Sequence, residues 1–134
     1  MKVIDFGGTH SAHSIAQLEQ LLRARFRNQE NEFLLAPDAS KYPYLSIMVR
    51  GDVAVLYYFP EGDHAGYLAV GGKLNLDLQE MTTFQIGGLD PGDTIDIQNE
   101  FIVPFSEALK VAEEFFHSQE LPRSIEWFEL QTRA

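Results

Sequence analysis

The four histidines are the first residues to weigh as chemical groups, because two of them have the spacing of a metal-ligand pair. His10 and His13 form an H-x-x-H pair, while His64 and His117 lie far away in the chain. A zinc site needs three or four ligands, each held by supporting hydrogen bonds, and the segment around His10 offers no third ligand. We therefore expect no metal here and interpret this pair as part of a solvated loop that precedes a helix.

Several short motifs match known signatures only in part. Asp5-Phe6-Gly7 has the kinase tripeptide without a glycine-rich phosphate loop or a catalytic loop, and Arg50-Gly51-Asp52 has the integrin-binding tripeptide at a predicted hairpin turn. The glycine pairs fall at turns, outside any nucleotide-binding pattern, and no serine lies in a G-x-S-x-G elbow. We nominate no catalytic residue and no cofactor.

Carboxylates are the one dense chemical group. The chain has 20 acidic and 10 basic residues, a net charge of −10, and residues 74–109 contain no lysine or arginine. The acids of this window cluster around turns such as Asp90 to Asp93, where aspartate bonds the local backbone and is usually solvated. An enzyme with paired acids would instead need two of them in one pocket at a fixed separation. We therefore predict that the protein is not an enzyme.

This uneven charge restricts the possible partners. Phosphate contact requires a basic face, so direct binding to nucleic acid or to an anionic membrane is not expected. A focused negative field instead accelerates the approach of a cationic protein. The simpler interpretation is a solvated surface that aids solubility.

Aromatic residues are frequent on or beside the predicted strands. Most belong to the core, because large aromatic side chains dominate core burial. A few near acidic loops would make interface anchors, since tyrosine and tryptophan are enriched at interface centres. We select Tyr58 and Tyr67 as possible anchors.

Length and composition indicate one domain over residues 1–134. Its 134 residues are enough to bury a core, and 45% of them are hydrophobic. There is no cysteine, and no apolar run approaches the roughly 20 residues that span a bilayer. The acid at Asp5 interrupts the apolar stretch that a signal peptide would need, so we expect a cytoplasmic protein.

Periodicity predicts many strands and two helices. Ser14 begins the first helix with Gln17 as its capping-box partner, and an apolar stripe runs to Phe26. The second helix spans about 105–117. Strands are predicted at 2–6, 44–49, 53–59, 66–70, 82–86, 94–97, 101–103 and 125–130, with a short apolar run at 33–36.

These elements predict an α+β fold, because runs of strands flanked by helices lack regular β-α alternation. We expect a mostly antiparallel, twisted sheet with both amphipathic helices packed on it. The strand at 53–59 is apolar on both faces and is therefore predicted to be central.

The order of these segments resembles immunity protein family one, the small antidote proteins encoded beside bacterial polymorphic toxins. The resemblance extends over roughly residues 14–130. The segments that carry it are Pro43 to Ile47, Val53 to Glu61, Gly66 to Gly71, Phe84 with Gly87-Gly88, Val103 to Leu109, Phe115-Phe116, Leu121-Pro122 and Ile125 to Trp127. These motifs are structural, and residues 74–81 and 89–93 depart from the family pattern.

The resemblance implies a cytoplasmic antitoxin that binds a cognate toxin, with family members associated with nuclease-like and nucleic-acid deaminase toxins. Such a toxin has a basic substrate groove, which a carboxylate patch could occupy. The predicted contact residues are Asp77, Glu80, Asp90, Asp93, Asp96 and Glu100, then Glu61 and Asp63, with Tyr58 and Tyr67 as anchors. The alternative is a non-enzymatic regulatory or small-ligand binding module, with a pocket between sheet and helices.

Overall fold

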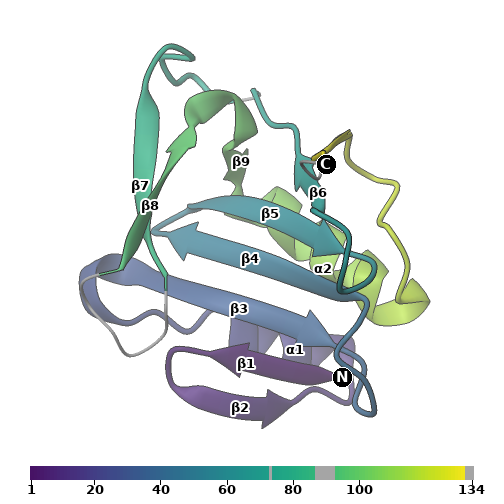
Figure 1. Ribbon diagram of the computed structural model, residues 1–134. Coiled ribbons are helices and arrows are strands. Elements are labelled where there is room, and N and C mark those ends of the chain that lie inside the picture. The colour runs from purple at the N-terminus through teal and green to yellow at the C-terminus, as the bar shows by residue number, and fades with distance from the viewer. Residues whose placement is uncertain (73, 87–92, 132–134) are drawn as a thin grey trace.

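The computed structural model spans residues 1–134 and describes all of them except 73, 87–92 and 132–134. Its strands form one large sheet of order β10-β6-β5-β4-β3-β1-β2, to which β9 adds beside β5, and a separate hairpin of β7 and β8. The pairs are antiparallel, so the predicted α+β class is confirmed (Figure 1). The large sheet contains β1 (Lys2–Asp5), β2 (Gly8–Ser11), β3 (Glu30–Ala36), β4 (Tyr44–Arg50), β5 (Val53–Phe59), β6 (Tyr67–Ala69), β9 (Val103–Pro104) and β10 (Trp127–Glu129).

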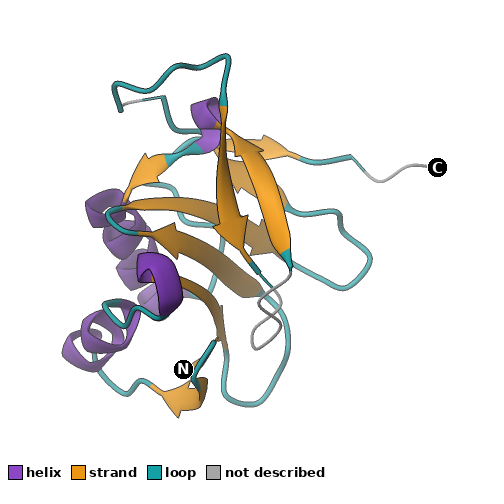
Figure 2. Ribbon diagram, turned by 90° about the vertical axis from the view of Figure 1, so that its left-hand side faces the viewer, coloured by secondary structure: helices purple, strands orange, loops and turns teal. Residues whose placement is uncertain are grey.

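The remaining elements cover the two faces of this sheet. They are α1 (Ile15–Leu22), α2 (Phe105–Ser118), the short 3-10 turns η1 (Arg27–Gln29) and η2 (Asn99–Phe101), and the hairpin strands β7 (Met81–Gln85) and β8 (Thr94–Gln98). Both helices lie on one face, and the β7–β8 hairpin crosses the other (Figure 2). The molecule therefore has three layers: helices, sheet and hairpin. Neither described helix has the length and the apolar composition that crossing a bilayer requires.

The start of α1 confirms the predicted cap. The side chain of Ser14 accepts the N–H of Gln17 at 3.2 Å, and the Gln17 side chain accepts the N–H of His13 at 2.7 Å. The helix ends earlier than the apolar stripe predicts, at Leu22, and Phe26 lies outside it with 43% of its surface exposed. The guanidinium of Arg25 donates to the carbonyl oxygen of Leu22 at 2.7 Å and so satisfies the last helical carbonyl.

The hairpin of β4 and β5 forms the centre of the sheet, as predicted. Its turn places Gly51 at a φ of 61°, a conformation that glycine adopts without strain. Along β5 the side chains alternate between the two covered faces, so both faces of this strand are apolar. The predicted central position of residues 53–59 is therefore confirmed.

The core beneath the helices is the larger one. Leu45, Ile47 and Leu56 from the sheet meet Leu18 of α1 and Phe115 of α2, and all five side chains are at most 1% exposed. Along α2 the buried positions are Ala108, Val111, Ala112 and Phe115, while Phe105, Leu109 and Phe116 are only partly buried. On this buried face the ring of Phe115 packs on Tyr58 of β5, with ring centres 6.0 Å apart.

The strand β2 was missed by the sequence interpretation, which ended the first strand at the glycine pair and placed His10 in a loop. Residues 8–11 instead turn back along β1, pairing Val3 with His10. Its sequence, GTHS, has no apolar alternation, because three of these four residues are exposed at the sheet edge.

Candidate functional site: an acidic hairpin beside an aromatic groove

The β7–β8 hairpin is held across the sheet by side chains from β3 and β4. The carboxylate of Glu30, which is 4% exposed, accepts the backbone N–H of Gln85 at 2.9 Å. The guanidinium of Arg50 donates to the carbonyl oxygen of Thr83 at 3.0 Å. Phe84 lies between them with no exposed surface and packs in the core cluster that contains Met48 and Val55. The hairpin is therefore fixed to the sheet by both hydrogen bonds and apolar packing.

Asn99, which is 6% exposed, joins the two ends of the hairpin. Its backbone N–H donates to the carbonyl oxygen of Glu80 at 3.0 Å, and its side-chain amide donates to the carbonyl oxygen of Asp77 at 2.9 Å. Its amide oxygen accepts the hydroxyl of Thr82 at 2.6 Å. One buried asparagine thus brings Asp77 and Glu80 beside Glu100, about twenty residues later in the chain.

The structure places five of the six main predicted contact acids on this hairpin or at its base, and we call them the hairpin acids. They are Asp77, Glu80, Asp93, Asp96 and Glu100, and all five are exposed. Asp96 projects from the outer side of β8 and accepts the hydroxyl of Thr83 on the paired strand. Within the part of the chain that the structure describes, none of the five is in an ion pair. Asp90, the sixth predicted acid, lies outside the described residues.

The other predicted contact residues lie elsewhere. Glu61 and Asp63 are exposed in the loop between β5 and β6, toward the opposite end of the sheet from the hairpin (Figure 1). Tyr58 is 6% exposed and packs on Phe115, so in this fold it belongs to the core and offers no anchor. Tyr67 is half-buried under the ring of His64, with ring centres 4.9 Å apart. We therefore leave Tyr58 out of the contact surface considered below.

His64 fixes the loop that carries Glu61 and Asp63. Its Nδ1 accepts the backbone N–H of Gly66 at 2.8 Å, and its Nε2 lies 2.9 Å from the carboxylate of Glu129 on β10. An accepting Nδ1 leaves the proton on Nε2, which donates to Glu129. Burial and the neighbouring Glu129 raise the pKa of the Tyr67 hydroxyl, so this phenol stays neutral.

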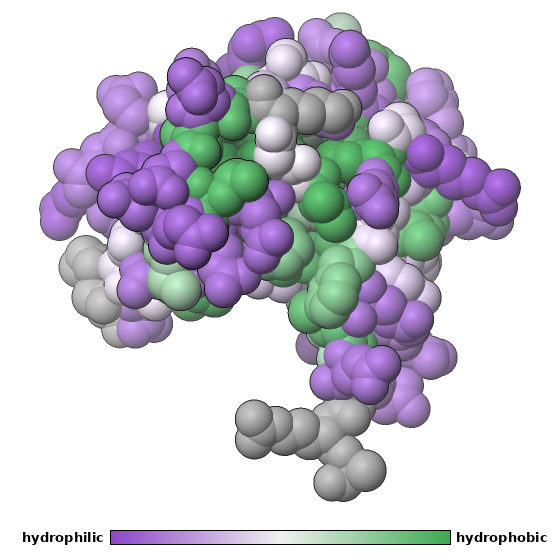
Figure 3. All heavy atoms as spheres, turned by 90° about the horizontal axis from the view of Figure 1, so that it is seen from above, coloured by the Kyte–Doolittle hydropathy of each residue, from purple (hydrophilic) through white to green (hydrophobic). Residues whose placement is uncertain are grey.

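Exposed apolar residues beside the hairpin acids were not singled out from the sequence. Leu78 and Met81 at the base of the hairpin are 53% and 58% exposed. Phe128 on β10 is 54% exposed, and its ring lies 6.4 Å from that of Phe101, next to Glu100. Seen from above, apolar side chains gather in the middle of the surface and polar ones surround them (Figure 3). An apolar centre with a polar rim is the usual anatomy of a protein–protein contact.

Below the hairpin, the outer face of the sheet forms an open hollow of about 220 Å³, which we call the aromatic groove. Its floor carries Tyr44, Tyr57 and Phe59, and Ile86 and Ile95 of the hairpin segment form one wall. Glu32 of β3 lies on the same lining. Burial, Tyr42 and Glu32 raise the pKa of the Tyr44 hydroxyl, in that order, so the carboxylate lies within electrostatic reach of this phenol.

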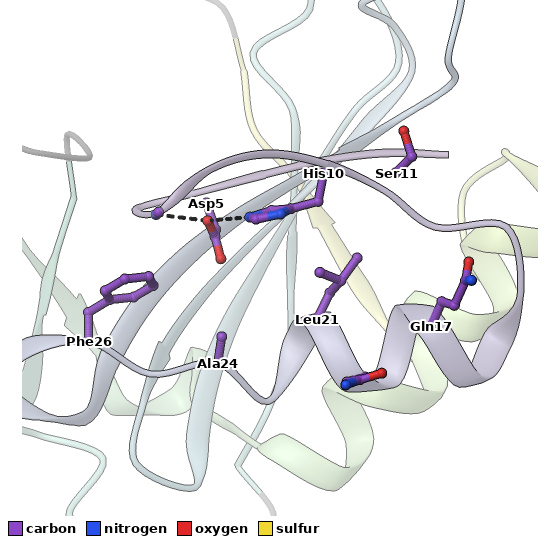
Figure 4. A pocket seen from close by; sticks show the side chains of 9 residues that line it. Asp5, His10, Ser11, Gln17, Leu21, Ala24 and Phe26 are labelled. Atoms are coloured by element: carbon purple, nitrogen blue, oxygen red, sulfur yellow. Dashed lines mark hydrogen bonds and ion pairs between the residues drawn. The ribbon is translucent and has the colours of Figure 1, made fainter.

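A second hollow, of about 700 Å³, separates the β1–β2 hairpin from α1 (Figure 4). His10 points into it and lies 3.1 Å from the carboxylate of Asp5, whose side chain is 3% exposed. That carboxylate also accepts the N–H of Gly7 at 2.8 Å and the side-chain amide of Asn31 at 3.2 Å. Among the described residues, no three histidine, aspartate or glutamate side chains are grouped so that they could hold a metal ion.

The side chain of Asn31 completes the hydrogen-bond network around Asp5. The side chain has no exposed surface, and it donates to the carbonyl oxygen of Ala24 at 3.0 Å while accepting the N–H of Phe6 at 3.2 Å. Asp5, His10 and Asn31 therefore connect the β1–β2 hairpin to the chain that follows α1. The bonds of Asp5 are used in holding the fold, and the arrangement is a structural one.

Comparison with known proteins adds a relative of nearly the same length. No family model matches the chain. The chain is similar to a protein of Burkholderia cenocepacia (strain H111) named double-stranded DNA deaminase immunity protein, with 25% identity over 126 residues. The aligned region covers 94% of this chain and 97% of that protein. The resemblance to an immunity protein, predicted from the order of strand and helix motifs, is therefore confirmed by a relative aligned along almost the whole of both chains.

Proposed function

We propose that this protein is an immunity protein that binds and neutralises a DNA-deaminating toxin. The observation that carries the proposal is the alignment of nearly the whole chain with a protein named as the immunity partner of such an enzyme. On this proposal the chain acts in the cytoplasm as one domain, performs no chemistry itself, and contacts neither nucleic acid nor membrane.

The hairpin acids supply the proposed mode of inhibition. An enzyme that acts on DNA needs a basic groove for the phosphates of its substrate. Five exposed carboxylates without ion-pair partners in the described chain form a negative surface that can occupy such a groove and exclude DNA. The buried Asn99 and Glu30 hold this surface in place before binding, which reduces the entropy lost on association.

The test is charge reversal at two hairpin acids whose side chains make no hydrogen bond in the described structure. We expect Asp93→Lys/Glu100→Lys to slow association with the toxin domain encoded beside this gene by about tenfold or more at low salt. The two sites are exposed, so the unfolding midpoint should stay the same. Stopped-flow or biosensor kinetics at two salt concentrations measure the effect.

The matched control is Glu120→Lys/Glu126→Lys, which changes the net charge equally at two exposed sites between α2 and β10. If both double variants slow association equally, net charge alone steers the toxin and the hairpin has no special role. If the unmodified protein neither binds the toxin domain nor rescues cells that express it, the proposed function itself is wrong.

A further inference from the structure

Three rings of the aromatic groove, with Tyr42 beyond its lining, form a ladder that the proposed mode of inhibition does not use. Tyr44 and Phe59 are direct partners across β4 and β5, with ring centres 4.7 Å apart and planes 28° apart. Tyr57 follows at 6.0 Å and 14° from Phe59, and Tyr42 at 5.5 Å from Tyr44. All four side chains are half-buried, so they remain accessible from the open side of the sheet.

The helix-covered face of the same strands shows why this ladder is unusual. There, the side chains of Leu45 and Leu56 have no exposed surface. On the groove side, the hairpin buries Met48 and Val55 and leaves the rings beyond them only partly covered. Partly exposed aromatic rings in a hollow are typical of the anchor pockets of interfaces.

The charge around the groove favours a cationic group over an anionic one. Glu32 lies on the lining, and Asp93 lies beside it, because its carbonyl oxygen accepts the N–H of the groove residue Ile86 at 3.1 Å. None of the described residues that line the groove is a lysine or an arginine. A phosphate or carboxylate ligand would be repelled, whereas a cation gains both from the carboxylate and from the ring faces.

We propose that the aromatic groove binds an arginine side chain of the toxin, with the guanidinium stacked on the rings of Tyr57 and Phe59 and paired with Glu32. This rests on the proposed function and names a contact for it. Arginine fits better than lysine because its planar guanidinium stacks on aromatic faces while its N–H groups bond a carboxylate. The arginine would enter beside Asp93, the hairpin acid at the groove end of β7 and β8.

Two variants test the carboxylate and the ring faces of this contact separately. Glu32→Gln keeps the shape of the side chain and removes its charge, and we expect it to weaken toxin binding by about tenfold. Tyr57→Leu/Phe59→Leu keeps apolar surface and removes the ring faces, and we expect a loss of about fivefold to tenfold. Calorimetric titration with the toxin domain measures both, and Glu120→Gln, at an exposed site just after α2, should bind as the unmodified protein does.

A double-mutant cycle then identifies the occupant. Each arginine of the toxin domain is changed to glutamine in turn, and each toxin variant is titrated with the unmodified protein and with Glu32→Gln. For one arginine, the change should weaken binding to the unmodified protein but not to Glu32→Gln. If no arginine couples to Glu32, or if the leucine variant binds as tightly as the unmodified protein, the groove proposal is overturned. Should Glu32→Gln fail to fold, as judged by its unfolding midpoint, a cycle with Tyr57→Leu decides the same question.

The outcomes also distinguish this inference from the proposed function. If the unmodified protein binds the toxin while the groove variants bind equally well, only the groove proposal fails. If an apolar side chain of the toxin fills the groove, removing the charge of Glu32 leaves affinity unchanged or raises it, which also overturns the proposal.

Discussion

The two faces of the large sheet are covered very differently. The helix face contains 19 buried core residues of the described chain, from Met1 to Phe115, whereas the hairpin face contains six. The helices close their face completely along β4 and β5, whereas the hairpin covers only part of the other face and leaves Tyr44, Tyr57 and Phe59 half-exposed. Apolar burial provides most of the folding free energy, so stability resides mainly on the helix face.

A small fold can thus keep a rigid core on one face of its sheet and a contact surface on the other. The hairpin face carries the hairpin acids and the aromatic groove, both of which are exposed to a partner. Its shape is set by the buried polar groups Glu30 and Asn99 together with a small core around Phe84. If the two faces are separable, a substitution on one face should leave the other face intact.

The largest expected effect is the loss of the Phe115 ring from the helix face. Phe115→Ala should lower the free energy of unfolding by about 3–5 kcal/mol, because the ring has no exposed surface and contacts Tyr58 of the central strand. Denaturant unfolding followed by circular dichroism measures this change. An effect below about 1 kcal/mol would contradict the assignment of stability to this core.

Phe84→Ala is the matching change on the hairpin face, since Phe84 is equally buried. We expect it to detach the hairpin locally, so that amides of β7 and β8 exchange with solvent much faster while those of β4 and β5 keep their protection. Hydrogen exchange measured by NMR resolves the two groups of amides. Equal loss of protection in both would show that the two faces unfold as one unit.

A smaller effect is expected at Gly71, where the chain passes close to the end of the hairpin. Its N–H donates to the carbonyl oxygen of Glu100 at 2.8 Å, and an added Cβ would overlap the carbonyl group of Ile102. Gly71→Ala should therefore cost about 1–3 kcal/mol by forcing the two segments apart. Gly62→Ala is the control, because its Cβ would meet only Tyr42 at an ordinary 3.5 Å.

The smallest expected effects involve two neighbouring glutamates of α2. A hydrogen bond with Glu19 of α1, burial and the charge of Glu19 raise the pKa of Glu113, in that order. A raised carboxyl pKa adds stability below the pKa of the unfolded chain, and this stability is lost as the pH rises through the folded value. Glu113→Gln should thus stabilise the protein at pH 7 by about 0.5 kcal/mol or less, since the pair is solvated, and the gain should vanish at pH 4.

Glu114 should respond in the opposite direction. Burial raises its pKa, but the hydroxyl of Ser124 and the backbone N–H groups of Arg123 and Ser124, at 2.7 and 3.1 Å, lower it by more. A lowered carboxyl pKa gives stability that is present at neutral pH and lost as the pH falls through the folded value. Glu114→Gln should therefore destabilise the protein slightly at pH 7 and not at pH 3. Thermal unfolding of both variants between pH 3 and pH 7 tests whether the two substitutions change stability in opposite directions.

Much of the fold could be predicted because strong local signals agree with the final structure. Ser14 and Gln17 predict where α1 begins, and the strand segments 44–49 and 53–59 with the turn between them predict the central hairpin. The strand β2 could not be predicted from its composition, because an exposed edge strand needs no apolar pattern. At the end of α1, Arg25 bonds the Leu22 carbonyl, and helical periodicity carries no signal of such a bond.

Composition and local pattern are enough to predict the excess of acid, the stretch of residues 74–109 without a cation, and the central position of β5, which is apolar on both faces. Only the tertiary structure decided that Asp77, Glu80 and Glu100 meet around one buried asparagine, that Tyr58 belongs to the core, and that Tyr44, Tyr57 and Phe59 line a groove. The reason is physical: composition and period are properties of neighbouring residues, whereas exposure depends on which distant segment covers a side chain. A tyrosine on either face of a central strand has the same local sequence signal, and only the packed helices or hairpin determine which one remains available to a partner.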